Sequence, residues 1–152
     1  MPSDLWDFAQ RLYGRPSVKH VCLQLQEAGA DVCLLLCGAW LQRHGMACTP
    51  ARLAHLQAIA QPWQTEVISP LRQLRQNWRT AAQQQAPLAA LRERLKELEL
   101  DAEQQLLLAL HACAHDWAAD SEGAAPAWLE ALAGTDAEPD ALQLLRDQAM
   151  QA

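Results

Sequence analysis

The chain has 152 residues, a formal net charge of −6 and a hydrophobic content of 51%. A chain of this length can bury a core without disulfides or a structural metal, so folding requires neither. Its longest uncharged apolar run, residues 32–41, has about half of the ~20 residues that a membrane-spanning helix needs, so we predict no membrane span. The negative charge disfavours extended nucleic acid, because binding it needs several uncompensated cationic contacts to phosphates, so we expect no DNA partner.

The cysteines and the N-terminal segment indicate a cytoplasmic protein. The five cysteines are odd in number and most lie within apolar helical patterns, where a free thiol packs as a small hydrophobic group. This usage is typical of a reducing compartment. Residues 1–14 combine two acidic residues with an amphipathic pattern, whereas a secretory signal needs a basic start and an apolar centre. We therefore expect a cytoplasmic location.

Helix start and stop signals divide the first half of the chain. We expect a first helix that ends at Gly14 and a second that starts at Pro16 and ends at Gly29. Asp31 then caps a third helix, which is apolar on all sides and extends to about His44. A threonine and a proline at positions 49 and 50 open a fourth helix, which the proline at position 62 restarts or bends.

Residues 63–79 separate an apolar stripe from a row of arginines. Helical spacing places the arginines roughly 110° round from the centre of the stripe. The proline at position 70 predicts a kink or a fresh start capped by Ser69, with the stripe staying in phase across it. Burial of the stripe would leave the arginines together at its margin, on the same side as Ile68. The stripe comprises Trp63, Val67, Leu71, Leu74 and Trp78, and the row comprises Arg72, Arg75 and Arg79.

Helical patterns continue through the second half of the chain. Residues 80–86 form the weakest segment and are expected to be a connection, after which Pro87 starts an amphipathic helix with a narrow apolar seam. Asp101 and Gln104 resemble a capping box, so the apolar run that follows either begins a new helix or continues this one. A last amphipathic helix is expected near the C-terminus, after a stretch rich in helix breakers.

These elements predict an all-α fold, a single compact bundle of about six or seven helices with two central apolar ones. The central helices are those around Leu35 and Leu108. Residues 1–118 form the expected helical core domain, and residues 119–152 form an acidic C-terminal extension packed on the same domain.

The charge is distributed unevenly along the chain. Residues 1–99 hold eleven Lys and Arg against eight Asp and Glu, whereas residues 100–152 hold one Arg against ten acidic residues. No acidic residue occurs between Glu66 and Glu93, the stretch that contains the arginine row. Two interpretations follow. The acidic C-terminal part folds over the arginine row, or the row is an exposed basic patch on an otherwise acidic protein.

Two residue pairs have spacings that suggest a metal site, and both have simpler interpretations. His111 and His115 lie four residues apart, as in a zinc site, but two further ligands are missing and Ala112 stands where a glutamate base would be. Cys33 and Cys37 lie in an uncharged core helix, which favours packing over metal binding or redox chemistry. The chain also lacks a nucleophile elbow and a glycine-rich phosphate loop. We therefore predict no metal, no cofactor and no catalytic residue.

Three segments of the chain resemble a known family. They are LWDFAQRLYGRPSV near the N-terminus, CLQLQEAGADVCLLLCGAWL after it, and the later VISPLRQLR. Together they are similar to a family of small proteobacterial proteins described as a domain of unknown function, over about residues 5–115. The resemblance implies a bacterial, cytoplasmic, all-helical protein, and it implies no particular reaction.

The arginine row carries the functional hypothesis. Guanidinium groups bind carboxylates and phosphates bidentately. We therefore expect a cytoplasmic interaction module that binds an acidic protein segment or a small phosphorylated ligand. The residues expected to make this site are Arg72, Arg75, Arg79, Ile68 and Trp78.

Two alternatives to the interaction module stay open. One is a small enzyme whose pocket lies between the third and fifth helices, with Arg72 and Arg75 holding an anionic substrate and Asp31 or a histidine as acid or base. The other is a structural role, in which the arginines are paired internally and bind no ligand. The sequence leaves the oligomeric state open.

Overall fold

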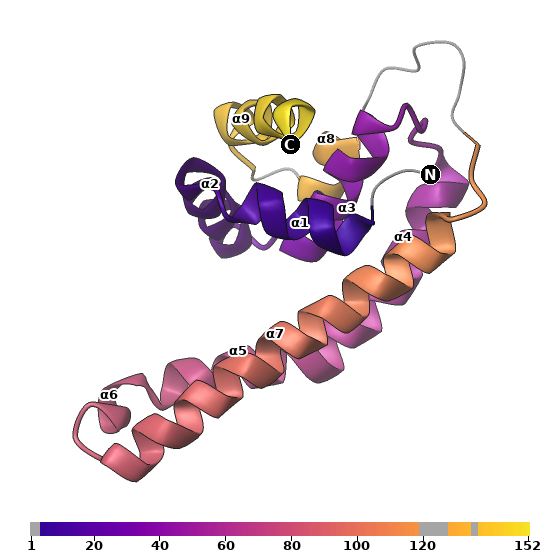
Figure 1. Ribbon diagram of the computed structural model, residues 1–152. Coiled ribbons are helices and arrows are strands. Elements are labelled where there is room, and N and C mark those ends of the chain that lie inside the picture. The colour runs from indigo at the N-terminus through magenta and orange to yellow at the C-terminus, as the bar shows by residue number, and fades with distance from the viewer. Residues whose placement is uncertain (1–3, 119–127, 135–136) are drawn as a thin grey trace.

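The computed structural model describes residues 4–118, 128–134 and 137–152, and every regular element in these ranges is a helix (Figure 1). This confirms the predicted all-α fold. None of the described helices is both long and apolar enough to span a membrane. The N-terminal helices are α1 (Leu5–Tyr13), α2 (Pro16–Glu27), α3 (Val32–Arg43) and α4 (Pro50–Trp63). They are followed by the π-helix η1 (Gln64–Ile68), α5 (Ser69–Asn77), α6 (Arg79–Ala82), α7 (Ala86–Ala114), α8 (Trp128–Ala133) and α9 (Pro139–Gln151).

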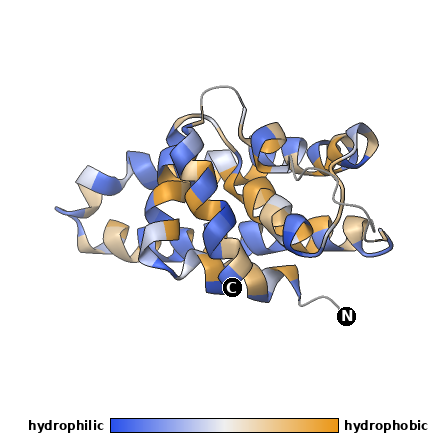
Figure 2. Ribbon diagram, turned by 90° about the horizontal axis from the view of Figure 1, so that it is seen from above, coloured by the Kyte–Doolittle hydropathy of each residue, from blue (hydrophilic) through white to orange (hydrophobic). Residues whose placement is uncertain are grey.

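Helix α3 is the centre of a globular end, where α1, α2, α8 and α9 pack around it (Figure 1). Leu35, Cys37 and Leu41 of α3 are fully buried, as its apolar sequence on all sides predicts. From the C-terminal helices, Trp128 and Leu145 join the same core. The hydrophobic residues therefore concentrate in the middle of the molecule (Figure 2).

The remaining helices form a long hairpin that projects from the globular end (Figure 1). Helices α4, η1 and α5 follow one another along one side, and α7 runs back along the other. Helix α7 is continuous over 29 residues, so residues 101–104 continue it and cap no new helix. Leu106 and Leu110 of α7 are buried, whereas Leu108 is 40% exposed. The end of α7 around Leu108 therefore contributes to the core, but Leu108 itself faces outward and the rest of α7 is one side of the hairpin. The short α6 lies partly in the segment predicted to be a connection.

The π-helix η1 interrupts the α-helical pattern of the hairpin at a proline. The N–H of Ser69 donates to the carbonyl oxygen of Gln64, five residues back, and the next residue, Pro70, has no N–H to donate. The side chain of Ser69 makes no capping hydrogen bond, so the predicted cap is wrong. Because a π-turn holds one residue more than an α-turn, η1 changes the phase of α5 relative to α4.

This change of phase corrects the prediction for the apolar stripe. Ile68 is fully buried together with Leu56 of α4, whereas an uninterrupted α-helix would place Val67, eleven residues after Leu56, in that position. Trp63 is 36% exposed and Leu74 39%, and no residue of α5 is buried. The predicted stripe is therefore only partly covered along the hairpin, and Ile68 belongs to the core.

Close packing of α3 on α8 makes a testable prediction at Gly38. A Cβ atom at this position would lie 2.7 Å from Cδ1 of Leu132 and 3.3 Å from Cβ of Trp128. We expect Gly38→Ala to lower the free energy of unfolding by about 1–2 kcal/mol, since overpacking outweighs the better helix propensity of alanine. Urea unfolding measures this. The double variant with Leu132→Ala should lose less free energy of unfolding than the two single variants lose together, because the shortened side chain removes the clash. A loss equal to that sum would contradict this explanation.

Candidate functional site

The buried carboxylate of Glu99 joins α7 to α5. It accepts hydrogen bonds from Nε of Arg72 (3.2 Å) and from Nε (2.5 Å) and Nη2 (3.3 Å) of Arg75. Glu99 is only 6% exposed, so its charge is removed from water and depends on both guanidinium groups. The hydrogen bond to Glu99 in turn raises the pKa of Arg75. We call Glu99, Arg72 and Arg75 together the Glu99 clamp.

Glu103, one helical turn after Glu99, adds a second carboxylate beside Arg72. Its Oε1 lies 3.5 Å from Nη2 of Arg72. Burial raises the pKa of Glu103, the charge of Glu99 raises it further, and Arg72 opposes the shift. Glu103 is therefore a carboxyl group that takes up a proton more readily than an exposed glutamate.

Two members of the arginine row, Arg72 and Arg75, are thus paired internally with acids of α7. Glu99 and Glu103 supply the carboxylates, and no described residue of the segment 119–152 forms an ion pair with Arg72 or Arg75. Within the described residues, the prediction that the C-terminal part folds over the row is wrong. Helices α8 and α9 instead pack on α2 and α3 at the globular end, because their apolar faces join the core there.

The five residues predicted to form one site lie in different surroundings. Arg72 lines a cleft, Arg75 is directed into the Glu99 clamp, and Arg79 is exposed on α6. Ile68 is in the core and Trp78 is half-buried. Ile68 therefore offers no exposed apolar contact, and the three arginines differ in exposure and in their contacts.

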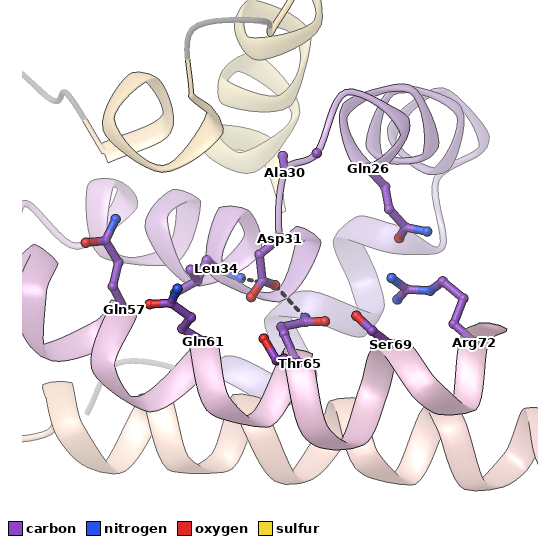
Figure 3. Close-up of a pocket in the computed structure, with 11 residues that line it drawn as sticks. Gln26, Ala30, Asp31, Leu34, Gln57, Gln61, Thr65, Ser69 and Arg72 are labelled. Carbon is purple, nitrogen blue, oxygen red and sulfur yellow. Dashed lines mark hydrogen bonds between the residues drawn. The ribbon is translucent and has the colours of Figure 1, made fainter.

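A polar cleft of about 520 Å³ lies between the α2–α3 turn and the α4–η1–α5 side of the hairpin (Figure 3). Figure 3 shows the guanidinium group of Arg72 at one end of it, near Gln26 and Ser69. Glutamines 57, 61 and 64 recur at helical spacing and line one wall. This spacing is a sequence signal for the cleft that our sequence analysis missed. The lining residues are Gln26, Gly29, Ala30, Asp31, Leu34, Gln57, Gln61, Gln64, Thr65, Ser69 and Arg72.

Asp31 is held at the cleft by its predicted role as N-cap of α3. Its Oδ1 accepts hydrogen bonds from the N–H of Leu34 (3.2 Å) and from Nε2 of Gln64 (2.8 Å). Burial raises the pKa of Asp31, and these two hydrogen bonds oppose the shift without cancelling it. The cleft therefore contains one guanidinium group and one carboxyl group with a raised pKa, an arrangement frequent at functional sites.

A second, more apolar pocket of about 270 Å³ lies next to the cleft and shares Gln26, Gln64 and Arg72 with it. Arg72 is thus a wall between a polar space and an apolar one. The other lining residues are Trp6, Ala9, Gln10, Tyr13, Gly14, Val32, Cys33, Leu36, Leu100, Glu103 and Leu107.

The two histidines with zinc-like spacing lie elsewhere, beside the N-terminus of α1. Nδ1 of His111 accepts a hydrogen bond from the N–H of Leu5 (3.2 Å), and the rings of His111 and His115 stack with centroids 6.3 Å apart. Within the described residues, no group of three or more His, Cys, Asp or Glu side chains is arranged to hold a metal. Cys33 and Cys37 are buried, and burial raises the pKa of both thiols, as expected of packing residues.

The Glu99 clamp makes a stability prediction that uses its own neighbour as control. Arg75→Ala should lower the free energy of unfolding by about 1–3 kcal/mol, since it leaves a buried carboxylate short of two hydrogen bonds. Arg79→Ala, at an exposed position with no ion-pair partner among the described residues, should change it by less than about 0.5 kcal/mol. Equal effects of the two substitutions in urea unfolding would show that the clamp contributes nothing.

The raised pKa values of Asp31 and Glu103 predict a pH dependence of stability. In the unfolded chain these two carboxyl groups lose their protons near their ordinary pKa values of 3.8 and 4.5, whereas the folded protein keeps the protons to higher pH. The free energy of unfolding should therefore fall as pH rises from these values through the raised pKa values of the folded state. Asp31→Asn should flatten this fall, because asparagine caps a helix as well and does not titrate. Urea unfolding between about pH 4 and pH 7 tests this, and an identical slope in both proteins would contradict it.

Comparison with known proteins places the site in a family. Searches of curated proteins and of solved structures gave no match. A family described as a protein of unknown function (DUF2390) matches residues 4–110. This match includes the Glu99 clamp, the cleft and the apolar pocket, and it ends before α8. The chain therefore belongs to the DUF2390 family, in agreement with the resemblance of its three segments to a domain of unknown function.

Proposed function

We propose that the protein binds a small anionic molecule in the cleft, with the guanidinium group of Arg72 as the main contact. The observation that supports this most directly is the position of Arg72, which lines both the cleft and the apolar pocket. Gln26 and Ser69 lie near it at the same end of the cleft (Figure 3). Amide and hydroxyl donors around one guanidinium group suit a phosphate or a carboxylate.

The hydrogen bonds of the Glu99 clamp leave part of Arg72 available to a ligand. Arg75 makes two hydrogen bonds to Glu99, one of them 2.5 Å long, and supplies most of its countercharge. Arg72 uses Nε and Nη2 for Glu99 and Glu103, while its Nη1 has no hydrogen-bond partner among the described residues. A bound anion would compete with Glu103 for Arg72, and the raised pKa of Glu103 lets it take up a proton as the anion binds.

A small molecule fits this geometry better than an acidic protein segment. The side chain of Arg72 is only 20% exposed and that of Arg75 25%, so a flat protein surface would reach little of either guanidinium group. A segment with several carboxylates would need several exposed arginines side by side. The structure supports a recessed site with one principal cation.

The apolar pocket favours a ligand that carries a hydrocarbon or ring portion next to its anionic group. Tyr13, Leu36 and Leu107 line this pocket, and Arg72 separates it from the cleft. Burial of apolar surface contributes roughly 0.8 kcal/mol per methylene group. An anion alone would leave the apolar pocket empty, whereas an amphiphilic ligand would use both spaces.

A second candidate function is a small enzyme acting on the same kind of ligand. It is favoured by Asp31, whose carboxyl group lines the cleft together with Arg72 and has a raised pKa. A buried carboxyl of this kind can serve as a general acid or base when a reacting group lies within hydrogen-bond reach. Arg72 would then hold the anionic part of the substrate.

The experiment is a titration with inorganic phosphate and with octyl phosphate, followed in ¹H–¹⁵N spectra through the Nε–H of Arg72 and the side-chain amides of Gln26 and Gln64. We expect both ligands to shift these signals. Octyl phosphate should bind at least about tenfold more tightly, because two buried methylene groups already contribute that much. Unchanged signals at Arg72 with both ligands would contradict the proposal.

Two variants sharpen this titration. Arg72→Gln should abolish binding, whereas Arg79→Gln, which removes an exposed arginine outside the cleft, should bind as the wild type does. Phosphorus NMR of the octyl phosphate sample separates binding from catalysis. Release of inorganic phosphate by the wild type, lost in Asp31→Asn, would favour the enzyme over the binding protein.

A further inference from the structure

A stripe of exposed residues runs along α7 on the outside of the hairpin. Leu91 is 49% exposed, Leu98 52% and Leu108 40%, and the exposed Arg94 and Asp101 lie between them. At about 100° per residue, these five positions fall within roughly 100° of one another around the helix axis. We call them the α7 stripe.

The α7 stripe faces away from the proposed ligand site. Leu100 and Leu107 of the same helix line the apolar pocket, and two residues along a helix turn the side chain by about 200°. Leu98 and Leu100 thus point to different sides of the hairpin. Figure 1 shows the distal half of the hairpin projecting from the globular end, so no part of that end covers this half of α7.

We propose that the α7 stripe binds the α7 stripe of a second copy of this chain, antiparallel and around a two-fold axis next to Leu98. The charges of the stripe support this occupant. Arg94 and Asp101 lie seven residues apart, on either side of Leu98, and neither forms an ion pair with another described residue. Antiparallel pairing places Arg94 of each copy against Asp101 of the other, so one contact is made twice, as two-fold symmetry requires.

The apolar residues of the stripe fit the same arrangement. Leu98 of one copy lies beside Leu98 of the other at the axis, and Leu91 and Leu108 extend the apolar contact to both sides. The overlap of about 20 residues corresponds to roughly 30 Å of helix. Two hairpins that associate in this way are joined by one antiparallel helix pair, in which each α7 covers the exposed leucines of the other.

The first test measures oligomeric state by analytical ultracentrifugation of the full chain. We expect the wild type to dimerise with increasing concentration and Leu98→Glu to stay monomeric, because the two-fold axis brings the two introduced carboxylates together. Leu100→Glu is the matched control, since Leu100 is 53% exposed on the same helix but faces the apolar pocket. It should dimerise as the wild type does, and circular dichroism checks that both variants are folded. A wild type that is monomeric at all concentrations would overturn the proposal.

The second test checks the antiparallel arrangement. Arg94→Asp places acid against acid at both symmetric contacts, and Asp101→Arg places base against base, so each variant alone should dimerise at least several-fold more weakly. An equimolar mixture should recover dimers, because in the mixed dimer every acid meets a base. Self-association that is unchanged in both single variants, or weakened without recovery in the mixture, would overturn this pairing in favour of another partner surface.

Discussion

The rest of the hairpin depends on one interaction, the binding of the Glu99 carboxylate by both Arg72 and Arg75. A carboxylate with so little exposure is stable only when charged donors replace its water, and Arg72 and Arg75 supply them from one face of α5. Because both donors lie on one helix and the acceptor on another, the contact fixes the rotation of α5 against α7. The same contact holds Arg72 in place as the wall between the cleft and the apolar pocket.

The π-helix η1 is the second constraint on the hairpin, because it sets the rotation of α5 relative to α4. It arises where Pro70 removes a backbone donor, and it ends at Ile68, the residue that enters the core. Gln64, at its first position, reaches Asp31 of α3. The interruption therefore connects the hairpin to the globular end through one side-chain hydrogen bond and one buried side chain. An uninterrupted α-helix would place Val67 in the buried position that Ile68 occupies.

Helix α7 shows how a long helix in a hairpin can serve different purposes on its different sides. Its inner face packs Leu95 and Leu106 against the other side of the hairpin, and Leu107 lines the apolar pocket. The outer face carries exposed leucines among charged residues. Each face is set by helical periodicity alone, but what each face meets depends on the path of the rest of the chain.

Local signals allowed much of the secondary structure to be predicted. Gly29, with a φ of 99°, ends the second helix, Asp31 caps the third, and prolines start the helices at residues 16 and 50. Each signal acts within one turn of helix, so it can be recognised from the sequence without knowledge of the tertiary structure. Of the predicted row, Arg72 and Arg75 lie together against Glu99, whereas Arg79 is exposed on α6. Of the candidate site, Arg72 and Asp31 were named together in the enzyme hypothesis, and Arg72 also in that of the interaction module.

The sequence by itself determined the all-α class, most helix boundaries and the apolar character of α3, because these follow from local hydrogen bonding and periodicity. Only the tertiary structure decided which acids pair with the arginines, since Arg72 and Glu99 are 27 residues apart and meet through the hairpin. It also decided the phase of the arginine-bearing run, where a single π-turn moved Ile68 from the predicted site into the core. Pairing and phase depend on how helices pack against each other, and no local pattern in one helix contains that information.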